Sequence, residues 1–244
     1  MSGSWIVLGA SSAMARAFAR EAARRGLRLV LCGRDMEDME ATAADLRIRH
    51  GVEVELFRFD ARDAETHREL ARRAAAWEGP LSVAVFIASM PPQEEIDEDP
   101  ELIAGMIADG YGGVLSVLHR LAPLIERRGG TVLGIGSVAG DRGRLGNYVY
   151  GSVKAGMHTY LAGLRNRLGR AGAHVVTVKP GFVDTAMTWG LPGLFLVASP
   201  EDVARDCWRA IEKRRNVIYT PWFWRWIMLI IRMIPEAIFK RLSI

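Results

Sequence analysis

The sequence has few cysteines and no long apolar run. Cys32 and Cys207 are the two cysteines among 244 residues, too few for a disulfide framework or a metal cluster, so we expect a reducing compartment and no metal site. Because no run of about 18 uninterrupted apolar residues occurs, we expect no transmembrane helix. The apolar run at 5–8 is also too short for a secretory signal peptide.

The chain has little net charge, and the charge is unevenly distributed. The net charge is +4, but residues 209–244 hold eight bases and two acids, a net +6 that leaves −2 for the rest. Since the basic character belongs to the end of the chain, a nucleic-acid surface is not supported. Half of the residues are hydrophobic and a quarter are charged, which is typical of a globular domain with a sizeable core.

Apolar strands alternate with helical stretches along the chain. We expect strands at 5–10, 27–33, 52–59, 81–88, 129–137 and 173–181, and helices at 14–25, 36–50, 64–77, 100–128 and 148–169. This alternation predicts one α/β domain of Rossmann type, a doubly wound parallel sheet with helices on both faces. We assign residues 1–220 to this domain and 221–244 to an amphipathic C-terminal tail.

A turn of small residues joins the first strand to the first helix, in the stretch VLGASSAMARAF. Such a turn brings backbone N–H groups and a helix N-terminus to a dinucleotide pyrophosphate. The residues expected to contact the cofactor here are Gly9, Ser11, Ser12, Ala13 and Met14. An ordinary strand–helix connection is the alternative, because alanines stand at 13 and 15 where glycines would mark the motif more strongly.

The second strand ends without an acid. An acid there would bind the ribose 2′-hydroxyl of NAD, whereas Gly33 followed by Arg34 suits the 2′-phosphate of NADP. NADP(H) is therefore favoured over NAD(H). The alternative is that Arg34 is a solvated loop residue with no role in cofactor binding.

The stretch GSVAGDRGRLGNYVYGSVKAG predicts a carbonyl-reducing site. Tyr150 and Lys154 lie four residues apart, on one face of a helix, and Ser137 follows a strand. A tyrosine needs a nearby cation to act as an acid–base group near neutral pH. Lys154 supplies that cation, and Ser137 can bond the substrate oxygen.

With these motifs in place, nearly the whole chain resembles the short-chain dehydrogenase/reductase family. The resemblance implies transfer of a hydride between nicotinamide and a carbonyl or alcohol, with Tyr150 as acid–base group and Lys154 also holding the nicotinamide ribose. It also implies an oligomer, a homodimer or homotetramer. The further cofactor contacts that it implies are Asp60, Ala61, Ala88, Pro180, Gly181, Val183 and Thr185.

One position departs from the family pattern. The asparagine that helps to hold a proton-relay water in the family is matched by Gly110. Either Asp109 substitutes in part or the relay is organised differently.

Two features favour a lipid-like substrate. The segment after Thr185 offers an apolar lid, comprising Met187, Trp189, Leu191, Leu194, Phe195 and Leu196. If 222–240 were helical, its charged residues would gather on one side, with Trp222, Trp226, Met228–Ile231 and Met233 around the rest, which suits a membrane surface. Core or dimer contacts are the alternative for the lid, and a subunit interface is the alternative for the tail.

The stretches at 136–156 and 224–242 also resemble the reductases of decaprenylphosphoryl-2-keto-erythro-pentose. That resemblance implies reduction of a polyprenyl-phosphate 2-ketosugar, a flavin oxidase as partner, and a cytoplasmic location on the inner face of the membrane. The alternatives are a reductase of soluble, acyl or steroid-like ketones and a catalytically impaired nucleotide-binding scaffold.

Overall fold

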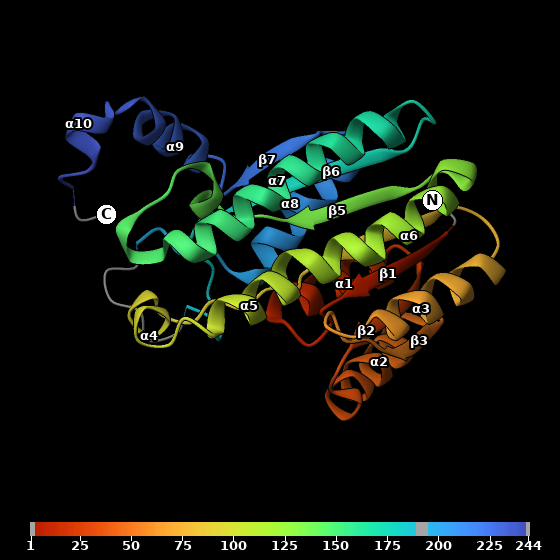
Figure 1. The fold of residues 1–244 in the computed structure, drawn as a ribbon. Coiled ribbons are helices and arrows are strands. Elements are labelled where there is room, and N and C mark those ends of the chain that lie inside the picture. Colours follow the sequence, from red (N-terminus) through yellow and green to blue (C-terminus); the bar gives the residue numbers. More distant parts are fainter. Residues whose placement is uncertain (1–2, 189–194, 243–244) are drawn as a thin grey trace.

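The fold is built on one parallel sheet. The computed structural model describes residues 3–188 and 195–242 (Figure 1). Its seven strands lie in the order β3-β2-β1-β4-β5-β6-β7, and every neighbouring pair is parallel. The predicted fold class is confirmed. The strands are β1 (Ser4–Leu8), β2 (Arg28–Gly33), β3 (Val54–Arg58), β4 (Leu81–Val85), β5 (Thr131–Ile135), β6 (His174–Pro180) and β7 (Val217–Thr220).

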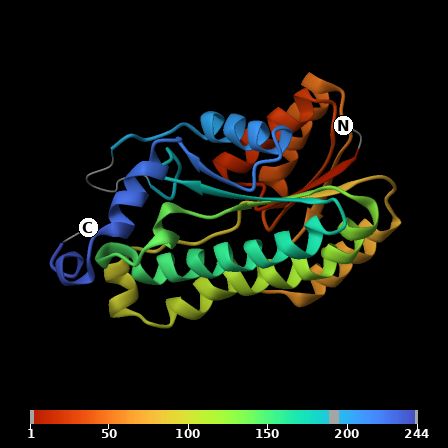
Figure 2. The same ribbon diagram turned by 90° about the horizontal axis from the view of Figure 1, so that it is seen from above.

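Helices cover both faces of the sheet, as Figure 2 shows. One apolar core joins the sheet to α1 (Ala13–Arg24), α2 (Met36–His50) and α8 (Pro200–Glu212). A second core joins the other face to α3 (Ala64–Ala76), α6 (Gly113–Arg128) and α7 (Tyr148–Gly169). Because both faces are covered, the central strands are buried along their whole length, which explains their continuous apolar sequences.

The order in which strands are added to the sheet reverses between β1 and β4. The first three strands proceed outward from β1, and the chain then returns so that β4 pairs with β1 on the other side. In open parallel sheets, ligands bind at the carboxyl ends of the strands on either side of such a switch point. The cavities described below lie at these strand ends.

Two elements, α8 and β7, were not among the predicted helices and strands. Helix α8 begins at a Ser199 cap and buries Trp208 against Trp5 and Phe18. Strand β7 has four residues, is partly exposed and, among the strands of the described residues, pairs only with β6. A short edge strand carries little apolar periodicity, so its pattern gives a weak signal.

The predicted helix at 100–128 is a composite. It consists of α5 (Leu102–Ile107), a π-helical turn at Ala108–Gly112, and α6, with the short α4 (Gln93–Glu98) before it. By length and composition alone, the stretch Leu102–Arg128 could cross a membrane. Within the described fold, however, the apolar residues of α6 pack on the sheet.

The tail forms two helices. Helix α9 (Trp224–Met233) and α10 (Glu236–Phe239) are separated at Pro235, which has no N–H to continue a helix. Trp224 and Met228 are buried in a cluster with Val138 and Phe182. Met228, one of the expected apolar residues of the tail, therefore faces the protein.

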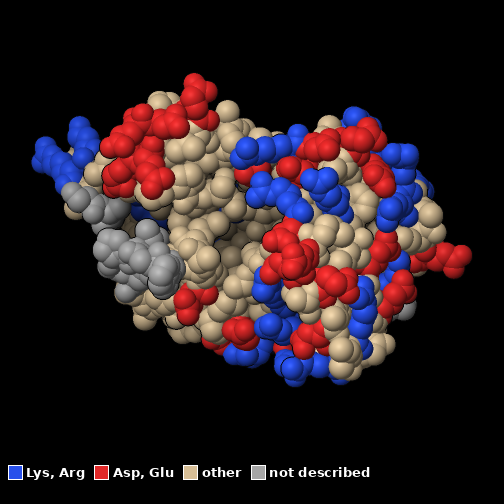
Figure 3. All heavy atoms as spheres, turned by 90° about the horizontal axis from the view of Figure 1, so that it is seen from below, with Lys and Arg blue, Asp and Glu red and all other residues tan. Residues whose placement is uncertain are grey.

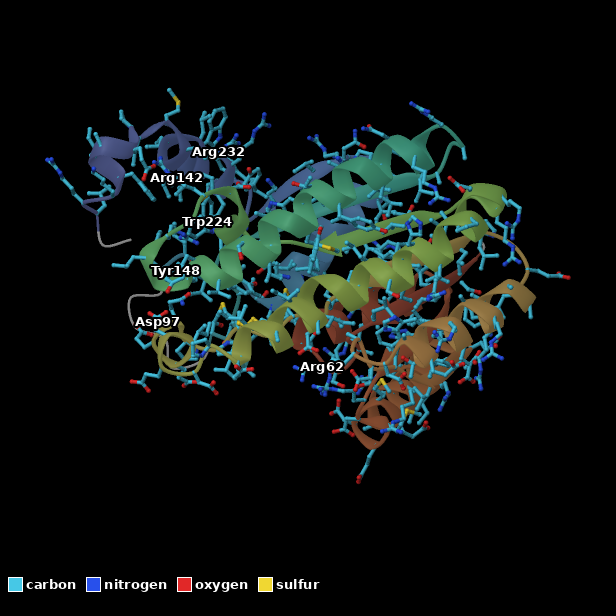
Figure 4. All side chains as sticks on the ribbon, in the orientation of Figure 1. Arg62, Asp97, Arg142, Tyr148, Trp224 and Arg232 are labelled. Atoms are coloured by element: carbon cyan, nitrogen blue, oxygen red, sulfur yellow. The ribbon has the colours of Figure 1, made fainter. Side chains whose placement is uncertain are left out.

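Arg142 fastens the tail to the loop that follows β5 (Figure 4). Its Nη1 donates to the carbonyl oxygens of Ile231 (2.5 Å) and Ile234 (2.7 Å), and its Nη2 donates to Glu236 (2.9 Å). The guanidinium also lies 3.6 Å from the centroid of the Phe239 ring. These contacts satisfy carbonyls that the end of a helix leaves without partners, so the tail is docked on the Rossmann domain.

Candidate active site

The predicted catalytic residues converge in one cavity. Ser137 follows β5 in an extended conformation and caps a short 3₁₀ turn, while α7 supplies Tyr150 and Lys154. Tyr150 and Lys154 are buried. All three side chains line a cavity of about 640 Å³, so the sequence spacing places them together as expected.

Burial controls the charges of this trio. It raises the pKa of Tyr150 to about 12, against a smaller lowering by its hydrogen bond with Ser137. Burial also lowers the pKa of Lys154 to about 8. The Lys154 Nζ donates to the carbonyl oxygen of Ile135 at 2.9 Å and lies 5.6 Å from the centroid of the Tyr150 ring. A protonated lysine at that distance favours the phenolate, so it can bring the phenol toward the pKa of an acid–base catalyst.

His158 supports Ser137 from behind. It lies one helical turn beyond Lys154, and its Nε2 accepts the backbone N–H of Ser137 at 3.3 Å. Its Nδ1 lies 3.6 Å from the Asp141 carboxylate. Burial, followed by the charge of Lys179, lowers the pKa of His158 to about 4. The ring is therefore neutral near pH 7 and able to accept this hydrogen bond.

Asp141 links this support to the sheet. Its Oδ1 accepts from Lys179 on β6 at 2.5 Å, and its Oδ2 accepts from the Tyr219 hydroxyl on β7 at 2.6 Å. Sequence reasoning missed this network. The available signals were His158 at a further four-residue spacing after Lys154, and Lys179 near the end of a largely apolar strand.

A second cavity, of about 340 Å³, extends the site to the far side of the β1–α1 turn. Every residue expected to contact the cofactor lines one of the two cavities. The 640 Å³ cavity includes Ala13, Met14, Tyr150, Lys154, Pro180, Gly181, Val183 and Thr185. The second includes Gly9, Arg34, Asp60 and Ala61, and both include Ser11, Ser12 and Ala88.

The residues of the turn fit a dinucleotide. Gly9 has a φ of +79°, and a Cβ there would come within 3.1 Å of the backbone at Phe86 and Ile87, so only glycine suits this turn. Ser12 caps α1, directing the helix N-terminus to the junction of the cavities. Ser89 lines the second cavity, and its buried hydroxyl has no hydrogen-bond partner within the part of the chain that the structure describes.

Gly110 lies in the π-helical turn against α7. A Cβ at this position would come within 2.8 Å of a Val153 methyl group, so an asparagine side chain would require a shift. Asp109 is committed elsewhere, because its two carboxylate oxygens accept from Arg62 at 2.7 and 2.8 Å. The geometry therefore does not support Asp109 as the replacement for the asparagine.

The walls of the larger cavity are mostly uncharged, and Figure 3 shows a hollowed face with largely uncharged walls. Met187 lines the cavity, and Phe195 packs against Phe182 and Trp224. Leu196 is exposed. Three expected lid residues, Trp189, Leu191 and Leu194, lie outside the described residues.

Comparisons with known proteins agree with this geometry. The family model for short chain dehydrogenases matches residues 4–192. An uncharacterized oxidoreductase of Mycobacterium tuberculosis is 31% identical over 239 residues, which cover 97% of this chain and 96% of the relative. A serine 3-dehydrogenase of Agrobacterium fabrum is 29% identical over 196 residues, covering 77% of this chain and 75% of the relative.

Among solved structures, a short-chain dehydrogenase from Sphingobium yanoikuyae in complex with NADPH is similar to this chain. The TM-score is 0.78 at 26% identity, and the match covers 97% of this chain and 98% of the other. The sheet order β3-β2-β1-β4-β5-β6-β7 agrees with the fold of these matches. The chain therefore belongs to the short-chain dehydrogenase/reductase family and is an NAD(P)-dependent oxidoreductase.

Proposed function

We propose that this oxidoreductase uses NADPH to reduce a ketone on a lipid-linked substrate, a polyprenyl-phosphate 2-ketosugar. The observation that carries this proposal is the continuity between the catalytic cavity and the tail. Trp224 of α9 contacts Phe182, which lines the cavity that contains Tyr150. The resemblance of 136–156 and 224–242 to decaprenylphosphoryl-2-keto-erythro-pentose reductases supports the same substrate class.

Ser137, Tyr150 and Lys154 are suited to the proton transfer that accompanies reduction of the carbonyl. When bound, the nicotinamide supplies the hydrogen and electron pair that reduce a carbonyl carbon. Ser137 would bond the carbonyl oxygen, and Tyr150 would donate the proton to it. Lys154 would stabilise the resulting phenolate and bind the nicotinamide ribose.

The preference for NADPH rests on the end of β2. Arg34 lines the second cavity next to Gly33, where an NAD-binding protein would carry an acid. The nearby Asp35 caps α2, since its carboxylate accepts the backbone N–H of Asp38 at 3.0 Å. The carboxylate is thus already engaged, while the guanidinium suits a 2′-phosphate.

The exposed surface of the tail supports binding to the cytoplasmic face of a membrane. Its exposed apolar side chains include Trp222 (72% exposed), Trp226, Leu229, Ile230 and Met233 (73% exposed). Four exposed bases, Arg225, Arg232, Lys240 and Arg241, lie among them. Tryptophan and aliphatic side chains enter the headgroup layer while arginine and lysine remain near the phosphates. This arrangement would hold the cavity beside a lipid-borne ketone.

The Tyr150→Phe variant tests the chemistry. We expect it to lose turnover and to retain NADPH binding, measured by NADPH oxidation and by titration of nucleotide fluorescence. An active Tyr150→Phe enzyme would refute the mechanism.

A panel of ketones, assayed with and without liposomes, tests the substrate class. Activity on a polyprenyl-phosphate 2-ketosugar supports the proposal, and activity confined to soluble, acyl or steroid-like ketones contradicts it. Nucleotide binding without turnover of any ketone would indicate a scaffold.

A further inference from the structure

Arg144 places a guanidinium in the catalytic cavity. It lies on the loop between Ser137 and Tyr150, and its side chain lines the same cavity as both of them. Asn147, one turn before the trio tyrosine, also lines this cavity. The substrate side of the cavity therefore combines a cation and an amide with otherwise largely uncharged walls.

No side chain within the described residues forms a hydrogen bond or ion pair with Arg144. Its Nε is buried without a partner, and so is the Oδ1 of Asn147. The acid that acts on its charge is Asp141, whose two oxygens already accept from Lys179 and Tyr219. Arg144 is half-buried, and leaving its buried Nε without an acceptor is costly, so a ligand that accepts a hydrogen bond from this guanidinium is favoured.

The other arginines of the cavity have carboxylate partners. Arg16 pairs with Asp38, and Arg20 pairs with Glu201 at 3.7 Å. Both line the cavity from α1, the helix whose N-terminus faces the cofactor. Arg144 therefore differs from them in lying on the loop before α7 and in having no carboxylate partner among the described residues.

We propose that Arg144 binds an oxyanion of the substrate, the phosphate of a lipid phosphate ester. This inference rests on the proposed function and names its specificity-determining residue. A guanidinium presents a planar fork of N–H donors that matches two oxygens of a phosphate. The apolar walls formed by Met90, Met187 and Phe182 would accept the first part of the lipid chain, and the ketone would then lie toward Tyr150.

The test measures ligand binding without requiring turnover. The enzyme is first saturated with NADP⁺, so that added phosphate cannot occupy the cofactor site. Binding of decyl phosphate, inorganic phosphate and decanol is then measured by calorimetry for the wild type, Arg144→Met, Arg144→Lys and Arg170→Gln. Arg170 is exposed at the other end of α7, so this last variant controls for the loss of one positive charge.

We expect decyl phosphate to bind the wild type and the Arg170→Gln variant equally well. Arg144→Met should weaken that binding by about 10-fold or more, as expected for loss of a charge-assisted hydrogen-bonded pair, and Arg144→Lys should weaken it less. Decanol binding should be the same in all four proteins. Equal affinity of the wild type and Arg144→Met for decyl phosphate would overturn the proposal.

Two further readouts separate the alternatives. If inorganic phosphate binds as tightly as decyl phosphate in an Arg144-dependent way, the anion is a soluble phosphate and the lipid part of the proposal is wrong. If Arg144→Met unfolds at a lower temperature than the wild type, Arg144 is a structural residue, contrary to the proposal. Failure of the proposed function would instead be seen as no ketone turnover by the wild type, whatever the outcome of these titrations.

Discussion

Replacing Arg142 should release the tail without unfolding the Rossmann domain. The Arg142→Gln variant loses two hydrogen bonds from a charged donor to the carbonyls of Ile231 and Ile234, the contact with Phe239 and the pair with Glu236. Charged hydrogen bonds contribute about 1.5–3 kcal/mol each, a cation–π contact about 1 kcal/mol and an exposed ion pair less. These contributions overlap and are offset by desolvation, so we take about 3 kcal/mol for the docking of the tail.

Native-state hydrogen exchange measures this quantity segment by segment. At about 1.4 kcal/mol per factor of ten, a loss of about 3 kcal/mol corresponds to an increase of about 150-fold in the exchange rate of amides that open with the tail. We expect this increase in peptides covering α9 and α10, while peptides from β5 and α6 keep their protection. The control is Arg232→Gln, which removes an exposed charge from the same helix.

Two outcomes would refute the reasoning. If α9 exchanges equally in the wild type and the Arg142→Gln variant, the apolar contacts of Trp224 and Met228 hold the tail without Arg142. If all peptides lose protection together, the tail unfolds only with the whole domain, and docking is not a separate step.

Three further predictions concern the cofactor and the buried charges. Arg34→Gln should raise KM for NADPH about 10-fold or more and leave KM for NADH little changed; an equal effect on both would contradict the assignment of Arg34 to the 2′-phosphate. Lys154→Met should be inactive yet about 3 kcal/mol more stable at pH 7, because burial lowers the pKa of Lys154 from 10.5 to about 8. That gain in stability should shrink as pH rises from 8 and vanish above about 10.5. A melting temperature of Lys154→Met below that of the wild type at pH 7 would refute the prediction. Because burial lowers the pKa of His158 from 6.5 to about 4, the wild type should lose about 3 kcal/mol more stability than His158→Gln as pH falls from 6.5 to 4; parallel pH–stability curves would show that His158 does not titrate in this way.

Much of the site could be predicted because its signals are local. Four residues separate Tyr150 from Lys154, which places both on one face of a helix whatever the rest of the fold does. The cofactor residues lie where apolar strands end, and parallel strands bring their carboxyl ends to one edge of the sheet. The pairing of Tyr150 with Lys154 therefore follows from helical geometry alone, whereas the cofactor contacts from Asp60 to Thr185 were predicted from the family resemblance.

Other features depend on contacts between distant parts of the chain. Arg142 meets the tail 89 and 92 residues later, and Asp141 meets Tyr219 78 residues later. No periodicity marks such pairs, because each residue is an ordinary charged or polar residue within its own segment. The same holds for Gly110, because the space available for a side chain there is limited by Val153 on α7.

The sequence by itself determined the parallel α/β sheet, the nucleotide-binding strand ends and the trio, because each follows from spacing within one element or between consecutive elements. Only the tertiary structure decided that the tail is docked rather than free, that His158 supports Ser137, and that Arg144 lines the cavity with no side-chain partner among residues 3–188 and 195–242. Those properties depend on which side chains burial brings together, and burial is a property of the whole packed molecule.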